Sequence, residues 1–321
     1  MALRPAMLAQ VHAPVATSRT APDPAELIAL AGAARSLMGW QPSPRARQKG
    51  EYRAPLKGRG MEYLESRPYE AGDDVRALDW RLTARLGKPH TKLFREERER
   101  PVFLVVDLGP NMAFGTQGCF KRVQAARAAA LLAWKAVESG DRIGGIMHAG
   151  GLHRELVPAR GKLAAMRLLR QLVEIGAAAP DSLSSNGGNA SSQVMALRRL
   201  RRLARPGSLV FVIGDGRGLD DAAGKELAEL RRHCELGLLL VHDPLEISLP
   251  GLVRPLRVRQ GSQEHVLSPL TDAARTRYAE RFASREASLA RFAREHRIAL
   301  ATLLTTAKAF ESVQALLRAP R

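Results

Sequence analysis

One short stretch of the chain concentrates side chains that could do chemistry through charge and hydrogen bonding. It reads RPYEAGDDVRALDWRLTAR and starts at Arg67. Carboxylates and guanidiniums this close together form charge-assisted hydrogen bonds, which are stronger than neutral ones and hold a fixed geometry. The residues that we single out in this charged segment are Arg67, Tyr69, Gly72, Asp73, Asp74, Arg76, Asp79, Trp80 and Arg85.

Two interpretations of the charged segment are open, and we favour the structural one. In that interpretation Asp73 or Asp74 caps a helix whose apolar residues point inward, because aspartate oxygens accept bonds from the first helical N–H groups. Arg76 and Arg85 then tie carboxylates across the fold. The inward-pointing residues would be Val75, Leu78 and Trp80. In the alternative, the same charged side chains form a surface that faces a partner.

The chain carries none of the common catalytic motifs. It has no G-x-x-x-x-G-K-[ST] loop for nucleotide phosphates, no H-E-x-x-H zinc motif and no G-x-S-x-G nucleophile elbow. Asp243 and Glu246 could form an acid–base pair, but nothing near them in the sequence suggests a raised pKa. Cys119 and Cys234 lie far apart without metal or redox spacing, so we expect both to be buried and reduced. We therefore predict that the protein is not an enzyme.

The charge balance is strongly basic. Fifty Lys and Arg residues against 32 Asp and Glu give a formal net charge of +18. Such a field favours nucleic acid, an anionic membrane or an acidic protein as partner. Aromatic residues, which stack on bases, make up only 5% of the chain, and the arginines are widely spread. We interpret the excess mainly as solvated arginine faces and keep nucleic-acid association as an alternative.

The sequence also bears on where the protein works. No stretch approaches the roughly 20 consecutive apolar residues that a membrane-spanning helix needs. The N-terminus carries Arg4, but His12 and Pro14 interrupt the apolar core that a secretory signal requires. We expect a soluble protein of the bacterial cytoplasm.

The first hundred residues divide into two parts by composition. Residues 1–57 are expected to form a flexible or irregular arm, rich in Pro and Ala at first, with a short helix over residues 24–37. Residues 58–100 contain the charged segment and are expected to pack on the core.

From residue 101 onward, apolar strands alternate with helices. Continuous apolar runs at residues 102–107 and 208–215 are typical of strands buried on both faces. Further strands are predicted at residues 142–150, 152–157, 235–243, 252–267 and 298–304, helices at 120–140, 162–175, 194–204, 216–233, 272–297 and 309–317, and a polar loop at 181–192. This alternation predicts an α/β domain over residues 101–321, built on a doubly wound, mainly parallel sheet and ending in a helical part.

Ligands of doubly wound sheets bind at the carboxyl ends of the strands, and two of those ends carry aspartates. Asp107 ends the first strand, in DLGPNM, and Asp215 ends a later one, in IGDGRG. These two residues mark the edge of the sheet at which we expect the functional site.

The charged segment and the strand pattern together resemble a bacterial family known as domain of unknown function 58 (DUF58). The resemblance rests on the charged segment, on its flanks and on a later Asp-Pro-Leu-Glu stretch, from residue 58 to the C-terminus. The further matching residues are Gly58, Gly60, Glu62, Lys92, Phe94, Glu97, Glu99, Asp107, Met112, His242, Asp243, Pro244, Leu245 and Glu246. It implies a von Willebrand factor A-like (Rossmann-like) fold and a gene neighbourhood with a MoxR-type AAA+ ATPase. It also implies a role as adaptor or co-chaperone of that ATPase toward a client protein.

The resemblance implies, in addition, where a metal ion would bind. A von Willebrand factor A domain holds a divalent ion with Asp-x-Ser-x-Ser after the first strand, a Thr in a second loop and an Asp after a later strand. Such oxygens are the ligands that Mg²⁺ prefers. Here Gly109 and Asn111 stand at the serine positions, and Ser191 or Ser192 would have to replace the Thr. The expected ligands of a Mg²⁺ ion are Asp107, Asn111, Ser191 and Asp215. The alternative is a degenerate site, whose aspartates bond loop amides or cap helices.

Three functions remain open on this evidence. The favoured one is an adaptor that binds a protein partner through the rim at the carboxyl ends of the strands. The alternatives are a basic nucleic-acid-associated protein and a structural partner in a cell-envelope assembly.

Overall fold

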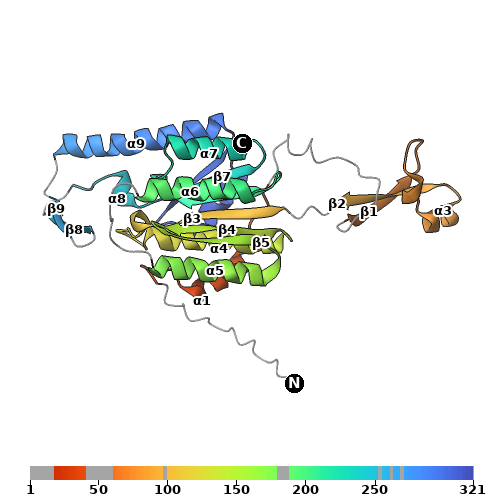
Figure 1. The fold of residues 1–321 in the computed structure, drawn as a ribbon, viewed down its shortest axis with the longest axis horizontal. Coiled ribbons are helices and arrows are strands. Elements are labelled where there is room, and N and C mark those ends of the chain that lie inside the picture. The colour runs from red at the N-terminus through yellow and green to blue at the C-terminus, as the bar shows by residue number, and fades with distance from the viewer. Residues whose placement is uncertain are drawn as a thin grey trace, which may run out of the picture. The chain divides into compact units, whose positions relative to one another are not determined.

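The computed structural model describes residues 18–40, 61–96, 100–178, 188–251, 255–260, 263–267 and 271–320. The chain divides into two compact units, a larger one of residues 1–41 and 101–321 and a smaller one of residues 42–100. In the larger unit a central sheet is covered by helices on both faces, and the smaller unit is a strand pair with a short helix (Figure 1).

The sheet of the larger unit has six strands in the order β10-β7-β6-β3-β4-β5. These strands are β3 (Pro101–Asp107), β4 (Arg142–Ala149), β5 (Leu152–Ala159), β6 (Leu209–Gly214), β7 (Glu235–His242) and β10 (Ala299–Leu304). Neighbours pair in parallel except β4 and β5, which form an antiparallel hairpin. The predicted doubly wound, mainly parallel α/β fold is confirmed. Its winding reverses between β3 and β6, and such a switch point is where doubly wound sheets bind ligands.

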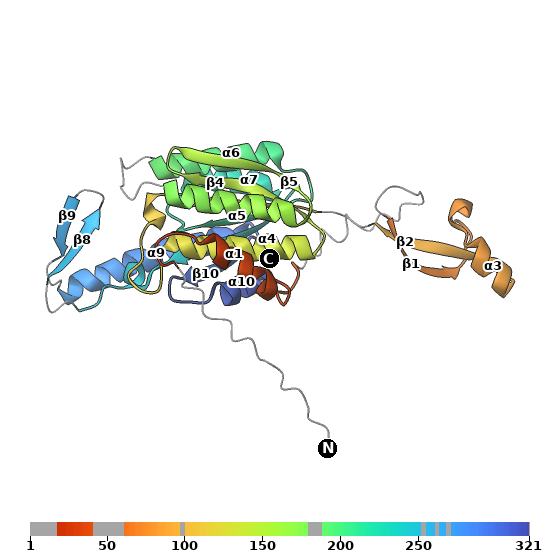
Figure 2. The same cartoon turned by 90° about the horizontal axis from the view of Figure 1, so that it is seen from below.

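Helices of the larger unit cover both faces of this sheet, as the two views in Figures 1 and 2 show. One face carries α1 (Pro24–Ala34), α4 (Lys121–Glu138), α5 (Gly161–Ala178) and α10 (Ala309–Arg318). The other carries α6 (Gly188–Leu203), α7 (Asp221–Arg231) and α9 (Asp272–Glu295). A short helix α8 (Pro244–Ile247) follows β7, and a hairpin of β8 (Leu256–Gln260) and β9 (Gln263–Leu267) precedes α9.

Strand β3 shows why a continuous apolar run is needed at the centre of this fold. Successive side chains of a strand point to opposite faces. Val102, Leu104 and Val106 pack in the core on the α4 side, whereas Phe103 and Val105 pack in the core on the α6 side. Because both faces are covered, a polar residue at any of these positions would be buried.

Helix α1 differs from the prediction of an N-terminal arm over residues 1–57. It packs on α4 within the larger unit, where the Trp134 indole donates to the carbonyl of Leu27 at 3.0 Å. Arg127 Nε pairs with Glu26 Oε1 at 2.7 Å. The apolar residues of α1 thus complete a helix layer, which composition alone does not reveal.

The prediction of a polar loop over residues 181–192 is wrong for the C-terminal end of that loop. Helix α6 begins at Gly188, so Ser191 and Ser192 lie in a helix instead of a loop. The first part of the predicted loop, up to residue 187, lies outside the described residues.

The smaller unit is built on the antiparallel strands β1 (Met61–Pro68) and β2 (His90–Glu96). Between them lie a 3-10 turn (Val75–Ala77) and α3 (Trp80–Leu86), which ends at Gly87 in the left-handed conformation, with φ of 69°. Glycine adopts this conformation without the steric penalty of a side chain. That the smaller unit packs on the core stays a prediction.

Among the residues that the structure describes, no helix combines the length and the apolar character that a membrane crossing requires.

Candidate functional site

The two predicted aspartates meet at the switch point of the sheet. Asp107 ends β3 and Asp215 directly follows β6, its neighbour, and their exposed fractions are only 3% and 1%. A Cβ atom on Gly214 would lie 3.2 Å from the Cβ of Asp107, so a glycine at this position lets the two strand ends come close. A cavity of about 10 Å³ lies beside the two aspartates, no larger than one water molecule needs.

We call the loops at this edge of the sheet the rim. They follow β3, β6, β7 and β10 and comprise residues 108–120, 215–220, 243–248 and 305–308.

A buried lysine, which no motif of the sequence marks, lies at the centre of the site. Lys121 is the first residue of α4, and its side chain is fully buried. Its ammonium Nζ lies 3.3 Å from Asp215 Oδ2 and 2.9 Å from Glu246 Oε1. A cation at a helix N-terminus opposes the helix dipole and a buried one is costly, so the two carboxylates are what make this placement favourable.

Arg217 completes an ion cluster, by which we mean Lys121, Asp215, Arg217 and Glu246. Its guanidinium Nη2 lies 3.0 Å from Glu246 Oε1, and its Nε lies 3.5 Å from Asp215 Oδ2. Its side chain is 45% exposed, so the guanidinium reaches the surface of the rim while the ammonium of Lys121 stays inside. Two cations balance two carboxylates, and the ion cluster is neutral.

The ion cluster controls the protonation of Asp215. Burial raises the pKa of this carboxyl, but the Lys121 ammonium and the N–H and guanidinium of Arg217 outweigh burial and hold the pKa below its ordinary value of 3.8. Asp215 is therefore an ionised acceptor at neutral pH, unsuited to act as a general acid.

Asp243 ties three loops of the rim together. Its side chain is fully buried and accepts hydrogen bonds from the N–H (2.8 Å) and hydroxyl of Thr116, the N–H of Leu245 (3.0 Å) and the hydroxyl of Thr305 (2.8 Å). Its own N–H donates to Glu246 Oε2 at 3.1 Å, which forms a capping box at α8. Burial raises the pKa of Asp243, but the bonds from Thr116, Leu245 and Thr305 outweigh it and lower the pKa overall.

At the other positions of the von Willebrand pattern, the described contacts are as follows. Gly109 offers only its N–H, which donates to Asp107 Oδ1 at 2.8 Å. Asn111 lies in a 3-10 turn (Pro110–Met112), and the hydroxyl of Ser192 donates to the carbonyl of Gly150. The side chain of Ser191 lies outside the described part of the chain.

These donors fit a bound Mg²⁺ ion poorly. Asp215, one of the two carboxylates expected to hold the metal, is already paired with the ammonium of Lys121. Over the described residues, no group of three or more His, Cys, Asp or Glu side chains is arranged to hold a metal ion. The hydroxyl position at Gly109 lacks a side chain, so the oxygen ligands of a hard ion are incomplete.

In the charged segment, Asp74 acts as a cap as predicted, although at a 3-10 turn, and Asp79 adds a cap that was not predicted. Asp74 Oδ1 accepts from the N–H of Arg76 at 2.9 Å at the start of the 3-10 turn. Asp79 Oδ1 accepts from the N–H of Leu82 at 3.1 Å at the start of α3. Hydrogen bonds to backbone N–H groups, first among them that of Leu82, lower the pKa of Asp79.

Two other parts of the structural interpretation are wrong within the smaller unit. They are the inward direction of the apolar side chains and the carboxylate partners of Arg76 and Arg85. Within the smaller unit, Val75 and Trp80 do not pack inward, and 61% and 68% of their surfaces are exposed. Arg76 and Arg85 are exposed and form no ion pair with a described carboxylate. The cross-segment ion pair instead joins Arg67 Nη2 to Asp73 Oδ1 at 2.7 Å. A helix cap depends only on residues next to it in the sequence. Which side of a short helix faces inward depends instead on the strands against which the helix packs.

Sequence reasoning misses Lys121, Thr116 and Thr305. Lys121 opens an Ala-rich helix, where a lysine ordinarily points to solvent, so nothing in its neighbourhood predicts burial. For Asp243 and Glu246 a signal exists, since Asp-Pro followed by Glu at the third helical position is typical of a capped helix start.

Comparison with known proteins identifies relatives without a known function. A family model described as "Protein of unknown function DUF58" matches residues 65–288, more than two thirds of the chain. The uncharacterized proteins Rv1480 of Mycobacterium tuberculosis and Mb1516 of Mycobacterium bovis are each 34% identical over 204 residues. The alignments cover 63% of this chain and 62% of those relatives, so the chain spans less than two thirds of their length.

The solved structures that match are more distant in sequence. The conserved hypothetical protein BatB from Bacteroides thetaiotaomicron is 17% identical with a TM-score of 0.43, over 68% of this chain and 97% of that one. A von Willebrand factor type A protein from Catenulispora acidiphila is 14% identical with a TM-score of 0.31, over 48% of this chain and 35% of that one.

Proposed function

Because this chain belongs to the DUF58 family of proteins of unknown function, we propose that it is a non-enzymatic interaction module that binds a protein partner through the rim. We further propose that the partner is a MoxR-type AAA+ ATPase, that the chain acts as its adaptor toward a client protein, and that it does so in the cytoplasm. The family resemblance supports the identity of the partner, and the rim supports the mode of action.

The observation that carries this proposal is the fixed state of the carboxylates at the rim. Asp215, Asp243 and Glu246 are each held by buried hydrogen bonds or ion pairs. A general acid or base must exchange its proton near the working pH, whereas the pKa values of Asp215 and Asp243 are lowered. A cavity of about 10 Å³ also holds no organic substrate, since ligand pockets usually measure hundreds of cubic ångströms.

Carboxylates held by buried hydrogen bonds and ion pairs make the rim rigid. A rigid surface favours the binding of a protein partner. A partner that binds a preformed surface loses less conformational freedom than one that must order mobile loops. Asp243 orders the loop at Thr116 and the loop at Thr305 through hydrogen bonds to both. The rim therefore presents a preorganised protein-binding surface.

Affinity capture of the tagged full chain from its own nuclease-treated lysate, read by mass spectrometry, tests this proposal. Gln117→Arg places a bulky cation on an exposed loop of the rim. Ser139→Arg places the same side chain at the C-terminal end of α4, at the opposite edge of the sheet. We expect the AAA+ ATPase with the wild type and the Ser139 variant, and its loss with the Gln117 variant. Equal capture by all three would refute the rim as the binding surface.

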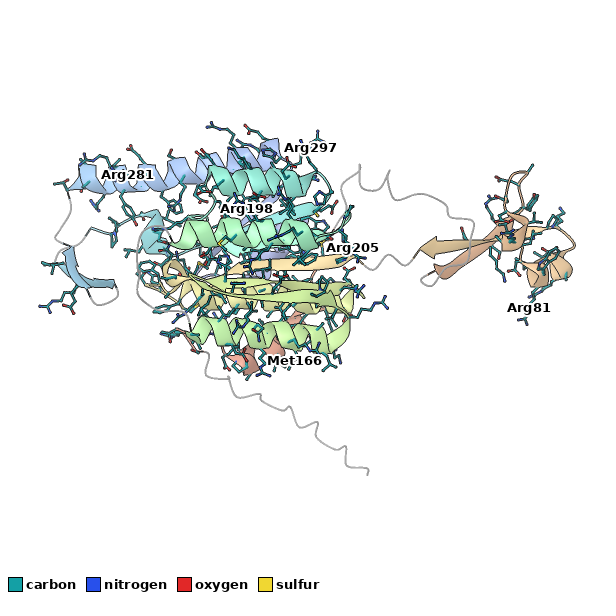
Figure 3. All side chains as sticks on the ribbon, in the orientation of Figure 1. Arg81, Met166, Arg198, Arg205, Arg281 and Arg297 are labelled. Carbon is teal, nitrogen blue, oxygen red and sulfur yellow. The ribbon has the colours of Figure 1, made fainter. Side chains whose placement is uncertain are left out.

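Nucleic-acid binding is the second candidate, and one specific feature bears on it. The last two turns of α6 carry four arginines and no acid: Arg198, Arg199, Arg201 and Arg202. Figure 3 shows Arg198 on α6, Arg205 beyond the end of that helix and Arg281 on α9. However, Arg198 and Arg201 both pair with Glu226 of α7, at 3.0 and 3.1 Å, which reduces the free charge of this surface. Partners captured from an untreated lysate but lost from the nuclease-treated one, together with retention on DNA that falls steeply with salt, would favour this candidate instead.

A further inference from the structure

We propose that the ammonium of Lys121 takes the place of the divalent cation in this fold, so that the rim is assembled without a metal ion. The inference concerns the architecture of the site and does not depend on the identity of the partner.

The position of the ammonium is the first support. Lys121 Nζ binds Asp215, the aspartate after β6 on which a metal site of this fold would rely. It also binds Glu246 of α8, so one cation joins the start of α4, the end of β6 and the start of α8. Joining three separate elements through one positive charge is the structural task of a bound divalent ion.

Burial gives the second support. The side chain of Lys121 has no exposed surface, and that of Asp215 is 1% exposed. A lysine in this state remains charged only if carboxylates compensate for its lost hydration, and two of them do. The pair is thus built into the core, unlike a surface ion pair that solvent could replace.

Charge balance gives the third support. The ion cluster is neutral, because Lys121 and Arg217 offset Asp215 and Glu246. A divalent cation at Asp215 would add two positive charges next to a buried ammonium, and like charges at such distances repel strongly in a poorly hydrated site. The metal and the ammonium therefore exclude each other.

The loss of metal-binding side chains is consistent with this exchange. At Gly109 a hydroxyl ligand is missing, and its backbone N–H satisfies Asp107 Oδ1 instead. The ammonium of Lys121 is fully buried, so a partner carboxylate cannot reach it as it would reach the open coordination position of a metal. Partner contact at this rim would pass through the loops themselves.

The test compares metal binding and thermal unfolding of the full chain with Mn²⁺ and Mg²⁺ as probes. For the wild type freed of metal by chelation, we expect no stoichiometric Mn²⁺ binding by calorimetry or electron paramagnetic resonance, and no dependence of Tm on either ion. Lys121→Ala leaves Asp215 and Glu246 without their cation. Its Tm should fall, and Mn²⁺ should restore part of the loss in a concentration-dependent way.

Two further variants make the test independent of whether Lys121→Ala folds. Lys121→Arg keeps a positive charge and should show no Mn²⁺ binding. Arg127→Ala removes another ion pair of α4, that with Glu26, and should lower Tm without rescue by Mn²⁺. One Mn²⁺ bound per wild-type chain and abolished by Asp215→Asn would overturn the proposal. A Lys121→Ala variant as stable as the wild type would overturn it as well, because the ammonium would then hold nothing together.

Discussion

Replacement of Asp243 by alanine should destabilise the protein strongly while leaving its secondary structure recognisable. The variant removes one buried carboxylate and leaves its hydrogen-bond donors without an acceptor. The hydroxyl of Thr305, itself 2% exposed, loses its acceptor, and a buried donor without a partner costs about 1–3 kcal/mol. The N–H of Leu245 loses a helix cap worth about 1 kcal/mol. The two bonds from the more exposed Thr116 contribute about 0.5–1 kcal/mol each.

Together these losses predict a decrease of about 4 kcal/mol in the free energy of unfolding. Because domains of this size are stable by only about 5–15 kcal/mol, this is a large fraction of the total. The measurement is urea unfolding followed by circular dichroism and by tryptophan fluorescence, with coincident transitions required before a single free energy is derived.

Asp220→Ala is the matched control. Asp220 also caps a helix, accepting from the N–H of Ala223 at 2.9 Å at the start of α7, but it is exposed and binds no second loop. Its replacement should cost about 1 kcal/mol. If Asp243→Ala cost no more than Asp220→Ala, Asp243 would be an ordinary helix cap, and the argument that it locks the rim would be refuted.

Three other outcomes follow from the structure. Gly118→Ala should destabilise by more than about 1 kcal/mol in the same urea assay, because Gly118 has φ of 74° and a Cβ atom would lie 2.3 Å from the carbonyl oxygen of Thr305; a neutral result would contradict this tight approach. Asp215 has a lowered pKa in the folded state, so its stabilisation is complete above its ordinary pKa of 3.8 and is lost as the pH falls through the folded value. The free energy of unfolding should thus fall below about pH 4, and less so in Asp215→Asn; an equal fall in both proteins would show that other groups govern acid unfolding. Trp80→Ala should change stability by less than about 0.5 kcal/mol, since 68% of the side chain is exposed, and a larger loss would show that the smaller unit buries Trp80 against another surface.

Local and periodic features of the chain were predictable without a structure. The runs that form β3 and β6 are apolar throughout, and only a strand covered on both faces needs such a run. Once these strands are parallel, Asp107 and Asp215 must share one edge of the sheet. The caps at Asp74 and Asp79 were equally accessible, because a capping carboxylate bonds an N–H only two or three residues later.

The character of the site was decided by contacts between distant parts of the chain. Lys121 meets Asp215 and Glu246, which lie 94 and 125 positions later, and no local pattern distinguishes it from a solvated lysine. The loop of Thr116 and that of Thr305, far apart in the sequence, are likewise both hydrogen-bonded to Asp243.

The sequence by itself thus determined the order of the elements, the parallel sheet and the edge at which a site forms, because hydrophobic periodicity and chain connectivity act over short distances. Only the tertiary structure decided that a buried ammonium stands beside Asp215, at the position where the family resemblance places the metal site. Burying a charge is favourable only where its counter-charges converge, and the folded chain alone brings them together.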